Sequence, residues 1–314
     1  MDSRTAADSC GTDAGPRAKT GAFVSMERSS LLTQRTALPA GKAPRVISIE
    51  GLIGGGKTSL IAGLMAELAA RRPDLRVRYV PEPAEEWVQV GALQRFYASA
   101  ENKNRADAVY VFQTYTYVTR VKAMLQALRE APGADILLTE RTVLTDRHVF
   151  MGVQKELVGA ELMAMYAAWC DLFAELLAPL DFSGALYVYL RPSVEACMSR
   201  VRQRARTGEI EAVRDGAASA REAPAETRAR APLGAGGVSE EYQRCLLRAH
   251  DAFLLGSGAP LPEVPFDRKK QVVLVDGELA DADFRGPCEA LSAIADKIID
   301  KIFAIWPELG CGPV

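Results

Sequence analysis

The sequence VISIEGLIGGGKT at residues 46–58 decides the fold. Three of its first four residues are β-branched and apolar, which is typical of a buried parallel strand. Residues 51–58 then fit G-x-x-x-x-G-K-[ST], and a helical pattern begins near Lys57. In such a strand–loop–helix unit the glycines let the backbone curl until successive N–H groups face inward, and the helix N-terminus adds partial positive charge. The motif predicts a site for the phosphates of a nucleoside triphosphate; a chance glycine-rich turn is the alternative.

Different residues of this loop are expected to bind the phosphates and the magnesium ion. The Lys57 ammonium would reach the β and γ phosphates, and the Thr58 hydroxyl would bind magnesium. The other expected contacts with the donor come from Gly51, Gly54, Gly55, Gly56 and Ser59.

Strand-like and helix-like stretches alternate from Arg45 onward, which predicts right-handed βαβ units. The expected strands are residues 46–49, 77–80, 136–139, 186–190 and 272–275. The expected helices are residues 58–71, 106–129, 156–177, 194–206, 240–255 and 287–305. We therefore expect an α/β fold of the P-loop type, three-layered α/β/α, with a five-stranded parallel sheet and a helical lid.

Two stretches of low complexity set the predicted domain boundaries. Residues 1–44 show no sustained period and are predicted to be a disordered tail, while residues 45–306 form the kinase-like domain and 307–314 a short C-terminal tail. A mitochondrial transit peptide is the alternative for the first segment, although its four acidic residues are unfavourable for one. The lid is expected at about residues 200–240, with a low-complexity insertion at 211–238.

Composition excludes several classes of function. The 38 basic and 40 acidic residues give a net charge of −2, whereas a protein that binds a nucleic acid polymer usually carries a basic excess. No apolar run approaches the roughly 18 residues of a membrane span. The six cysteines form no C-x-x-C pair, which argues against a disulfide framework or a zinc site. We expect a reduced, cytoplasmic protein, with a mitochondrial location as the minor alternative.

Two carboxylates follow predicted strands. Glu82 lies in the segment Val80-Pro81-Glu82-Pro83, and Glu140 ends the strand that precedes Arg141. Ligands of open α/β sheets bind outside the carboxyl ends of the strands, so both acids should lie near the loop. One could accept a proton from an attacking hydroxyl and the other could support magnesium, while Arg141 neutralises charge on the transferred group. A solvated loop residue is the alternative for each acid.

Taken together, these residues resemble the deoxynucleoside kinase family, which includes deoxycytidine, deoxyguanosine and mitochondrial thymidine kinases. The resemblance spans Arg45 to about Trp306 and contains five stretches in the family's order. They are the phosphate loop; Pro81-Glu82-Pro83 with Trp87; Phe112-Gln113-Thr114-Tyr115 with Arg120; Glu140-Arg141-Thr142 with Asp146-Arg147; and Arg200, Arg204 and Arg206 with Glu209 beyond.

The resemblance implies an activity and roles for residues. The activity would be transfer of the ATP γ-phosphoryl group to a deoxynucleoside 5′-hydroxyl, in nucleotide salvage and DNA precursor synthesis. Glu82 would be the base, and Arg141 and Lys57 would complete the catalytic set. Glu140, with Thr58, would serve the magnesium ion.

Further roles follow from the same resemblance. Gln113 would pair with the base edge, since its amide both donates and accepts. The slot around the base would be formed by Trp87, Phe112 and Phe150. The sugar 3′-hydroxyl would be held by Tyr97 and Glu209, and the donor by Arg200, Arg204, Arg206 and Asp276. The alternatives are core packing for the aromatic residues and a solvated basic helix for the arginines. Tyr97 lies further from Gln113 than the family pattern expects.

The resemblance also implies which positions set the base specificity, namely Thr116, Arg120 and Asp146. Arg120 and Asp146 could form a buried pair near the base, and a carboxylate there would accept from an exocyclic amine and repel thymine O4. We therefore predict a preference for deoxycytidine or a deoxypurine over thymidine.

Other functions remain open at this point. A thymidine kinase or a thymidylate-kinase-like enzyme is the nearest alternative, and a competition between nucleoside and monophosphate would separate the latter. A GTPase-type switch needs Asn-Lys-x-Asp after a strand, but Arg105 occupies the fourth position of the only near match, which begins at Asn102. A catalytically dead scaffold is the last alternative. The apolar helix at 156–177 and the family's habit favour a homodimer, whereas a fully buried central helix is the plainer interpretation.

Overall fold

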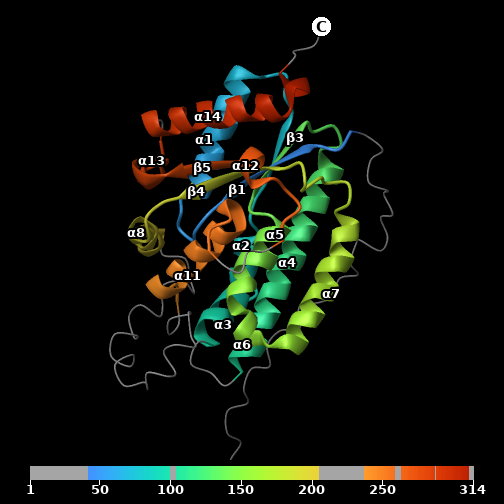
Figure 1. The fold of residues 1–314 in the computed structure, drawn as a ribbon, viewed down its shortest axis with the longest axis vertical. Helices are drawn as coiled ribbons and strands as arrows, with labels where there is room; N and C mark the ends of the chain where they lie inside the picture. The colour runs from blue at the N-terminus through green and yellow to red at the C-terminus, as the bar shows by residue number, and fades with distance from the viewer. Residues whose placement is uncertain (1–41, 100–103, 205–236, 259–262, 287, 311–314) are drawn as a thin grey trace, which may run out of the picture. The chain divides into compact units, whose positions relative to one another are not determined.

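Five strands pair in parallel, in the order β2-β3-β1-β4-β5 (Figure 1). The computed structural model describes residues 42–99, 104–204, 237–258, 263–286 and 288–310. The strands are β1 (Arg45–Glu50), β2 (Val77–Val80), β3 (Ile136–Glu140), β4 (Leu186–Arg191) and β5 (Val272–Asp276). The predicted five-stranded parallel sheet of a P-loop fold is confirmed.

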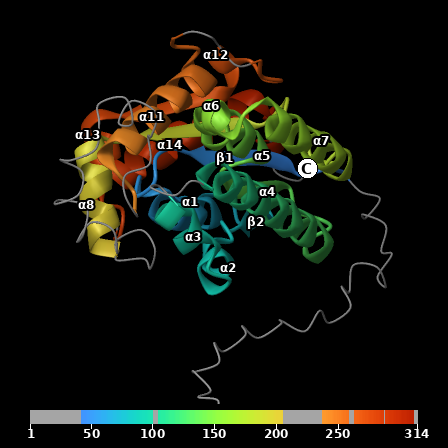
Figure 2. The same cartoon turned by 90° about the horizontal axis from the view of Figure 1, so that it is seen from below.

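Helices cover both faces of the sheet. In the described parts of the chain, the helices of eight or more residues are α1 (Lys57–Arg71), α4 (Arg105–Glu130), α7 (Ala160–Leu176), α8 (Val194–Arg204), α11 (Glu240–His250) and α14 (Glu289–Ile305). Shorter helices are α2 (Ala84–Gln89), α3 (Ala92–Ala98), α5 (Val143–Thr145), α6 (Lys155–Val158), α12 (Arg268–Gln271) and α13 (Gly277–Asp281). Ile47 and Ile49 pack against α1 and α14, whereas Val46 faces the second core with α4, α7 and α11. Figures 1 and 2 show α4 and α7 side by side.

Three local features differ from the sequence expectation. Gly159 adopts a positive φ of 82° and breaks the predicted 156–177 helix into α6 and α7. The predicted 240–255 helix ends as α11 and continues as the π-helical turn η4 (Asp251–Leu255). The turn Pro307–Leu309 buries Leu309 against the α1–α14 core, so packed structure extends past the predicted boundary at 306.

The predicted N-terminal tail, up to residue 41, and most of the predicted insertion at 211–238 lie outside the described residues. Among the helices that are described, none has the length and hydropathy needed to cross a membrane.

Candidate active site

Two adjoining cavities open at the carboxyl ends of the strands. The aromatic cavity is lined by Glu82, Trp87 and Gln113 among others. The loop cavity is lined by residues 54–59 among others. Both are lined by Gly54, Lys57, Glu140 and Arg204. A ligand in one cavity would therefore meet a ligand in the other at Lys57 and Glu140.

At Gly51 and at Gly54 the loop between β1 and α1 can take its path only with glycine. A Cβ on Gly51 would lie 2.2 Å from the Leu190 carbonyl oxygen, and φ at Gly51 is +138°. A Cβ on Gly54, where φ is +75°, would lie 2.6 Å from the Cys197 carbonyl oxygen of α8. The curled loop therefore packs directly on β4 and α8, with the N-terminus of α1 behind it.

Lys57 and Thr58 converge on Glu140 from the first turn of α1. Lys57 Nζ lies 2.8 Å from the Leu52 carbonyl oxygen and 3.5 Å from Glu140 Oε1. Burial, with the nearby Arg141 charge, lowers the pKa of Lys57 to about 8. Thr58 Oγ1 donates a 2.8 Å hydrogen bond to Glu140 Oε2. A hydroxyl and a carboxylate this close are the hard oxygen ligands that Mg²⁺ prefers, so the predicted pair fits that ion.

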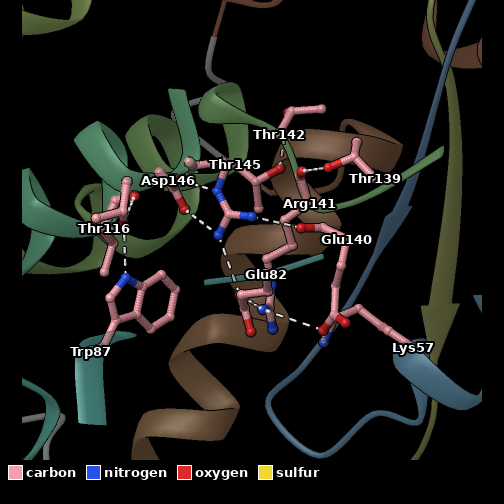
Figure 3. Close-up of polar contacts among 12 residues, drawn as sticks. Lys57, Glu82, Trp87, Thr116, Thr139, Glu140, Arg141, Thr142, Thr145 and Asp146 are labelled. Carbon is pink, nitrogen blue, oxygen red and sulfur yellow. Dashed lines mark hydrogen bonds and ion pairs between the residues drawn. The ribbon is translucent and has the colours of Figure 1, made fainter. Parts of the chain in front are cut away.

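Two arginines donate hydrogen bonds to Glu82 (Figure 3). Arg141 Nη1 donates to Glu82 Oε1 at 2.6 Å, and Arg120 Nη2 donates to the same oxygen at 3.2 Å. The Glu82 side chain is only 14% exposed, so both contacts are shielded from water. They orient the carboxylate within the aromatic cavity, where a substrate hydroxyl can approach it.

Arg141 is held in a strained conformation. Among the described residues it is the only non-glycine residue with positive φ, at 63°. Its N–H donates to the Ile49 carbonyl at 3.2 Å, its carbonyl accepts from Thr139 Oγ1 at 2.9 Å, and its guanidinium lies 4.8 Å from the Phe150 ring centroid. Strain of this kind persists where surrounding contacts determine it, commonly at active sites.

The predicted pair of Arg120 and Asp146 is confirmed. Arg120 Nε and Nη2 donate to the two Asp146 oxygens at 2.7 and 3.3 Å, and both side chains are nearly fully buried. Arg120 Nη1 also donates to the Glu140 carbonyl at 2.6 Å. The π-helical turn η2 (Asp146–Phe150) brings Asp146 and Phe150 into the same cavity wall. Arg120 thus links the Asp146 carboxylate to that of Glu82, and sequence reasoning did not predict this link.

Aromatic side chains form the remaining wall. Trp87 meets Phe112 edge-to-face at 5.8 Å between centroids, and its indole N–H donates to Thr119 Oγ1 at 2.9 Å. The other predicted residues that line this cavity are Tyr97, Gln113, Thr116 and Phe150. Sequence reasoning missed Ile53, Leu93, Phe96 and Tyr242, which also line it. Phe96 stacks on Phe112 at 4.4 Å, but the short α3 that carries it has too few residues to show a period.

Two of the three arginines predicted to form the lid, Arg200 and Arg204, lie within the described residues. Arg200 donates to the carbonyls of Gly55, Asp281 and Ala282 at 3.2, 2.7 and 2.8 Å and lines the loop cavity, as Arg204 does. Arg206 and Glu209 lie outside the described residues.

One predicted donor contact is displaced. Asp276 ends β5 but does not line either cavity; residues 281–285 line the loop cavity instead. The chain turns through α13 between these positions, so the strand end itself stays outside the cavity. Neither a strand nor a helix pattern marks the segment that replaces it.

Comparisons with known proteins agree with this geometry. The family model described as deoxynucleoside kinase matches residues 47–215, just over half of the chain. Deoxycytidine kinase 1 of Xenopus laevis is 28% identical over 195 residues, which cover 55% of this chain and 70% of the relative. A probable deoxycytidine kinase of Fowlpox virus is 29% identical over 165 residues, covering 51% and 61%. The thymidine kinase of Ictalurid herpesvirus 1 is 28% identical over 169 residues, covering 52% and 65%. With its phosphate loop, its strand-end carboxylates and this match, the chain belongs to the deoxynucleoside kinase family.

Proposed function

We propose that this chain transfers the γ-phosphoryl group of ATP to the 5′-hydroxyl of a deoxynucleoside in nucleotide salvage, with deoxycytidine or a deoxypurine preferred. The observation that carries the proposal is the position of Glu82. Its carboxylate lies in an aromatic-walled cavity that adjoins the phosphate loop through Lys57 and Glu140. This arrangement suits an unphosphorylated alcohol acceptor facing a triphosphate donor.

The mechanism follows from the two cavities. The base enters between the aromatic side chains, where the Gln113 amide contacts its edge. The 5′-hydroxyl then faces Glu82, which accepts its proton as the oxygen attacks the γ phosphorus. Lys57 and Arg141 neutralise the charge that spreads over the transferred group. Positioning supplies most of the rate, because phosphoryl transfer demands little covalent chemistry from the protein.

A divalent cation belongs to this proposal. Thr58 and Glu140 would hold Mg²⁺, because their oxygens already lie 2.8 Å apart at the edge of the loop cavity. When bound, the ion supplies positive charge beside the phosphates. The protein's part is to keep these two ligands in place through the first turn of α1 and the end of β3.

The base preference rests on Asp146. Because Arg120 holds both carboxylate oxygens, Asp146 has a fixed orientation in the cavity wall. A fixed carboxylate accepts a hydrogen bond from an exocyclic amine and repels a carbonyl oxygen, which favours cytosine or adenine over thymine. A thymidine kinase and a thymidylate-kinase-like enzyme remain the competing assignments. A competition assay between deoxycytidine, thymidine and thymidylate separates all three.

We also propose that residues 45–306, together with the turn Pro307–Leu309 that packs on them, form the kinase domain, with its lid at about 200–240. We propose further that this domain forms a homodimer through α7. Four side chains of α7 are 44–50% exposed although they are large and apolar: Met165, Trp169, Leu172 and Leu176. An apolar stripe of this kind on one helix marks an interaction surface. Light scattering coupled to size-exclusion chromatography tests the dimer, and a monomer at micromolar concentration would contradict it.

The decisive experiment is an assay of the four common deoxynucleosides with ATP and magnesium. Wild type is compared with Glu82→Ala and with Glu85→Ala, a matched control on the exposed side of α2. Loss of a general base lowers turnover by about 10²–10⁴, so Glu82→Ala should fall by that factor while Glu85→Ala stays active. The proposal fails if wild type phosphorylates no deoxynucleoside or if Glu82→Ala keeps full turnover.

A further inference from the structure

One buried side chain outside the predicted site contacts the phosphate loop. Gln243, on the first turn of α11, is fully buried, and its Nε2 donates to the Ile53 carbonyl oxygen at 2.6 Å. That turn is fixed by a helix cap, because Ser239 Oγ accepts from the Tyr242 N–H at 3.1 Å. The next residue back, Tyr242, lines the aromatic cavity. A rigid helical turn therefore connects to the loop through this one amide.

The contact controls the direction of a neighbouring N–H group. The Ile53 carbonyl and the Gly54 N–H belong to one trans peptide unit, so they point in opposite directions. With the carbonyl held towards α11, the Gly54 N–H is turned away from α11. It makes no backbone hydrogen bond among the described residues, and Gly54 lines both cavities. The Gly55 N–H, in contrast, already donates to the Leu52 carbonyl at 3.1 Å.

This loop needs an external support. Residues 54–56 are all glycine, so no side chain of their own restricts the rotation of their peptide units. Among the described residues, four side chains hold its carbonyls: Arg141 at Gly51, Lys57 at Leu52, Gln243 at Ile53 and Arg200 at Gly55. Under the proposed function, Lys57 turns to the phosphates when the donor binds. Gln243 has no such second task.

We propose that Gln243 is a positioning residue for the phosphate donor, which keeps the Gly54 N–H aimed at the bound phosphates. This inference rests on the proposed function only for the identity of the donor. The aimed N–H group serves any polyphosphate, because it recognises phosphate oxygens and not the nucleoside.

The test compares Gln243→Leu with Gln271→Leu. Gln271 is a matched control, since its buried amide also donates to backbone carbonyls, those of Ser183 and Ala185, but lines neither cavity. Calorimetry measures binding of ATP and of inorganic tripolyphosphate, at a temperature where thermal melting shows every variant folded. Steady-state kinetics measures KM for the deoxynucleoside.

We expect Gln243→Leu to bind both polyphosphates about tenfold more weakly, the size of one hydrogen bond, with KM for the deoxynucleoside unchanged within error. Gln271→Leu should bind both as wild type does. Wild-type affinity in Gln243→Leu, or equal weakening in Gln271→Leu, overturns the inference. A wild type that binds ATP and phosphorylates no deoxynucleoside refutes the proposed function instead, and the binding comparison still decides the role of Gln243.

Discussion

Removing Asp146 should change stability and base preference together. Asp146→Ala deletes a carboxylate that accepts two hydrogen bonds from Arg120, in a pair whose side chains are 3% and 4% exposed. Arg120 then stays buried, and its remaining hydrogen-bond partners among the described residues are the Glu140 carbonyl and Glu82. Breaking a buried pair from one side typically destabilises a protein by about 3–5 kcal/mol. The double variant Arg120→Met/Asp146→Ala removes both charges, so it should be more stable than the single variant by about 2 kcal/mol.

The assay has two readouts. Urea denaturation gives the free energy of unfolding of wild type, Asp146→Ala, Arg120→Met and the double variant, which together form a double-mutant cycle. Competition between thymidine and deoxycytidine gives the ratio of their kcat/KM values. A good contact to a base edge contributes about 1–3 kcal/mol of discrimination, so that ratio should rise by about tenfold or more in the double variant.

Two results would refute this reasoning. If the double variant is no more stable than Asp146→Ala, then the Arg120 charge is still compensated after Asp146 is removed. If the ratio of thymidine to deoxycytidine turnover does not rise in either variant, the carboxylate does not repel thymine.

Three further predictions concern other parts of the molecule. Burial lowers the pKa of Lys57 to about 8, so the ammonium loses its proton above that pH. Calorimetry should then show the affinity for ATP falling by up to about tenfold per pH unit above pH 8. The variant Lys57→Arg should show no such inflection. Gly51→Ala places a Cβ 2.2 Å from the Leu190 carbonyl oxygen and should lower the melting temperature or prevent folding, whereas Gly152→Ala, whose nearest contact is 3.7 Å, should melt as wild type does. Trp169→Glu should give a monomer in light scattering, because it places a charge in the exposed apolar stripe of α7; a dimer of wild-type strength would locate the interface elsewhere.

The strand positions could be read from the sequence because their cause is local. Each strand is a short apolar run between turn residues, and all five were predicted to within one residue at each end. The helix break at Gly159 was harder to predict, because a glycine inside a helical pattern is often tolerated. Only the backbone geometry showed that Gly159 breaks the helix. The short helices α2 and α3 span too few residues for a period to stand out.

The strand-end acids could also be predicted, for a topological reason. In a parallel sheet the carboxyl ends meet at one edge, so Glu82 and Glu140 had to approach the phosphate loop. The bond from Arg120 to Glu82 was not foreseeable in the same way. Arg120 lies in the middle of α4, and which of several nearby carboxylates it reaches depends on how that helix packs against β3 and η2.

By itself, the amino-acid sequence determined the phosphate loop, the strand–helix alternation and the family, because each is written in contiguous residues with fixed spacing. Only the tertiary structure decided which side chains close the cavities and which support the loop. Residues 53–56 share cavity walls with Tyr242 and the segment 281–285, and Ile53 accepts a hydrogen bond from Gln243. In the sequence, these partners lie more than half of the chain away from residues 53–56. Contacts over such separations arise from the packing of whole helices, and no local pattern of residues encodes them.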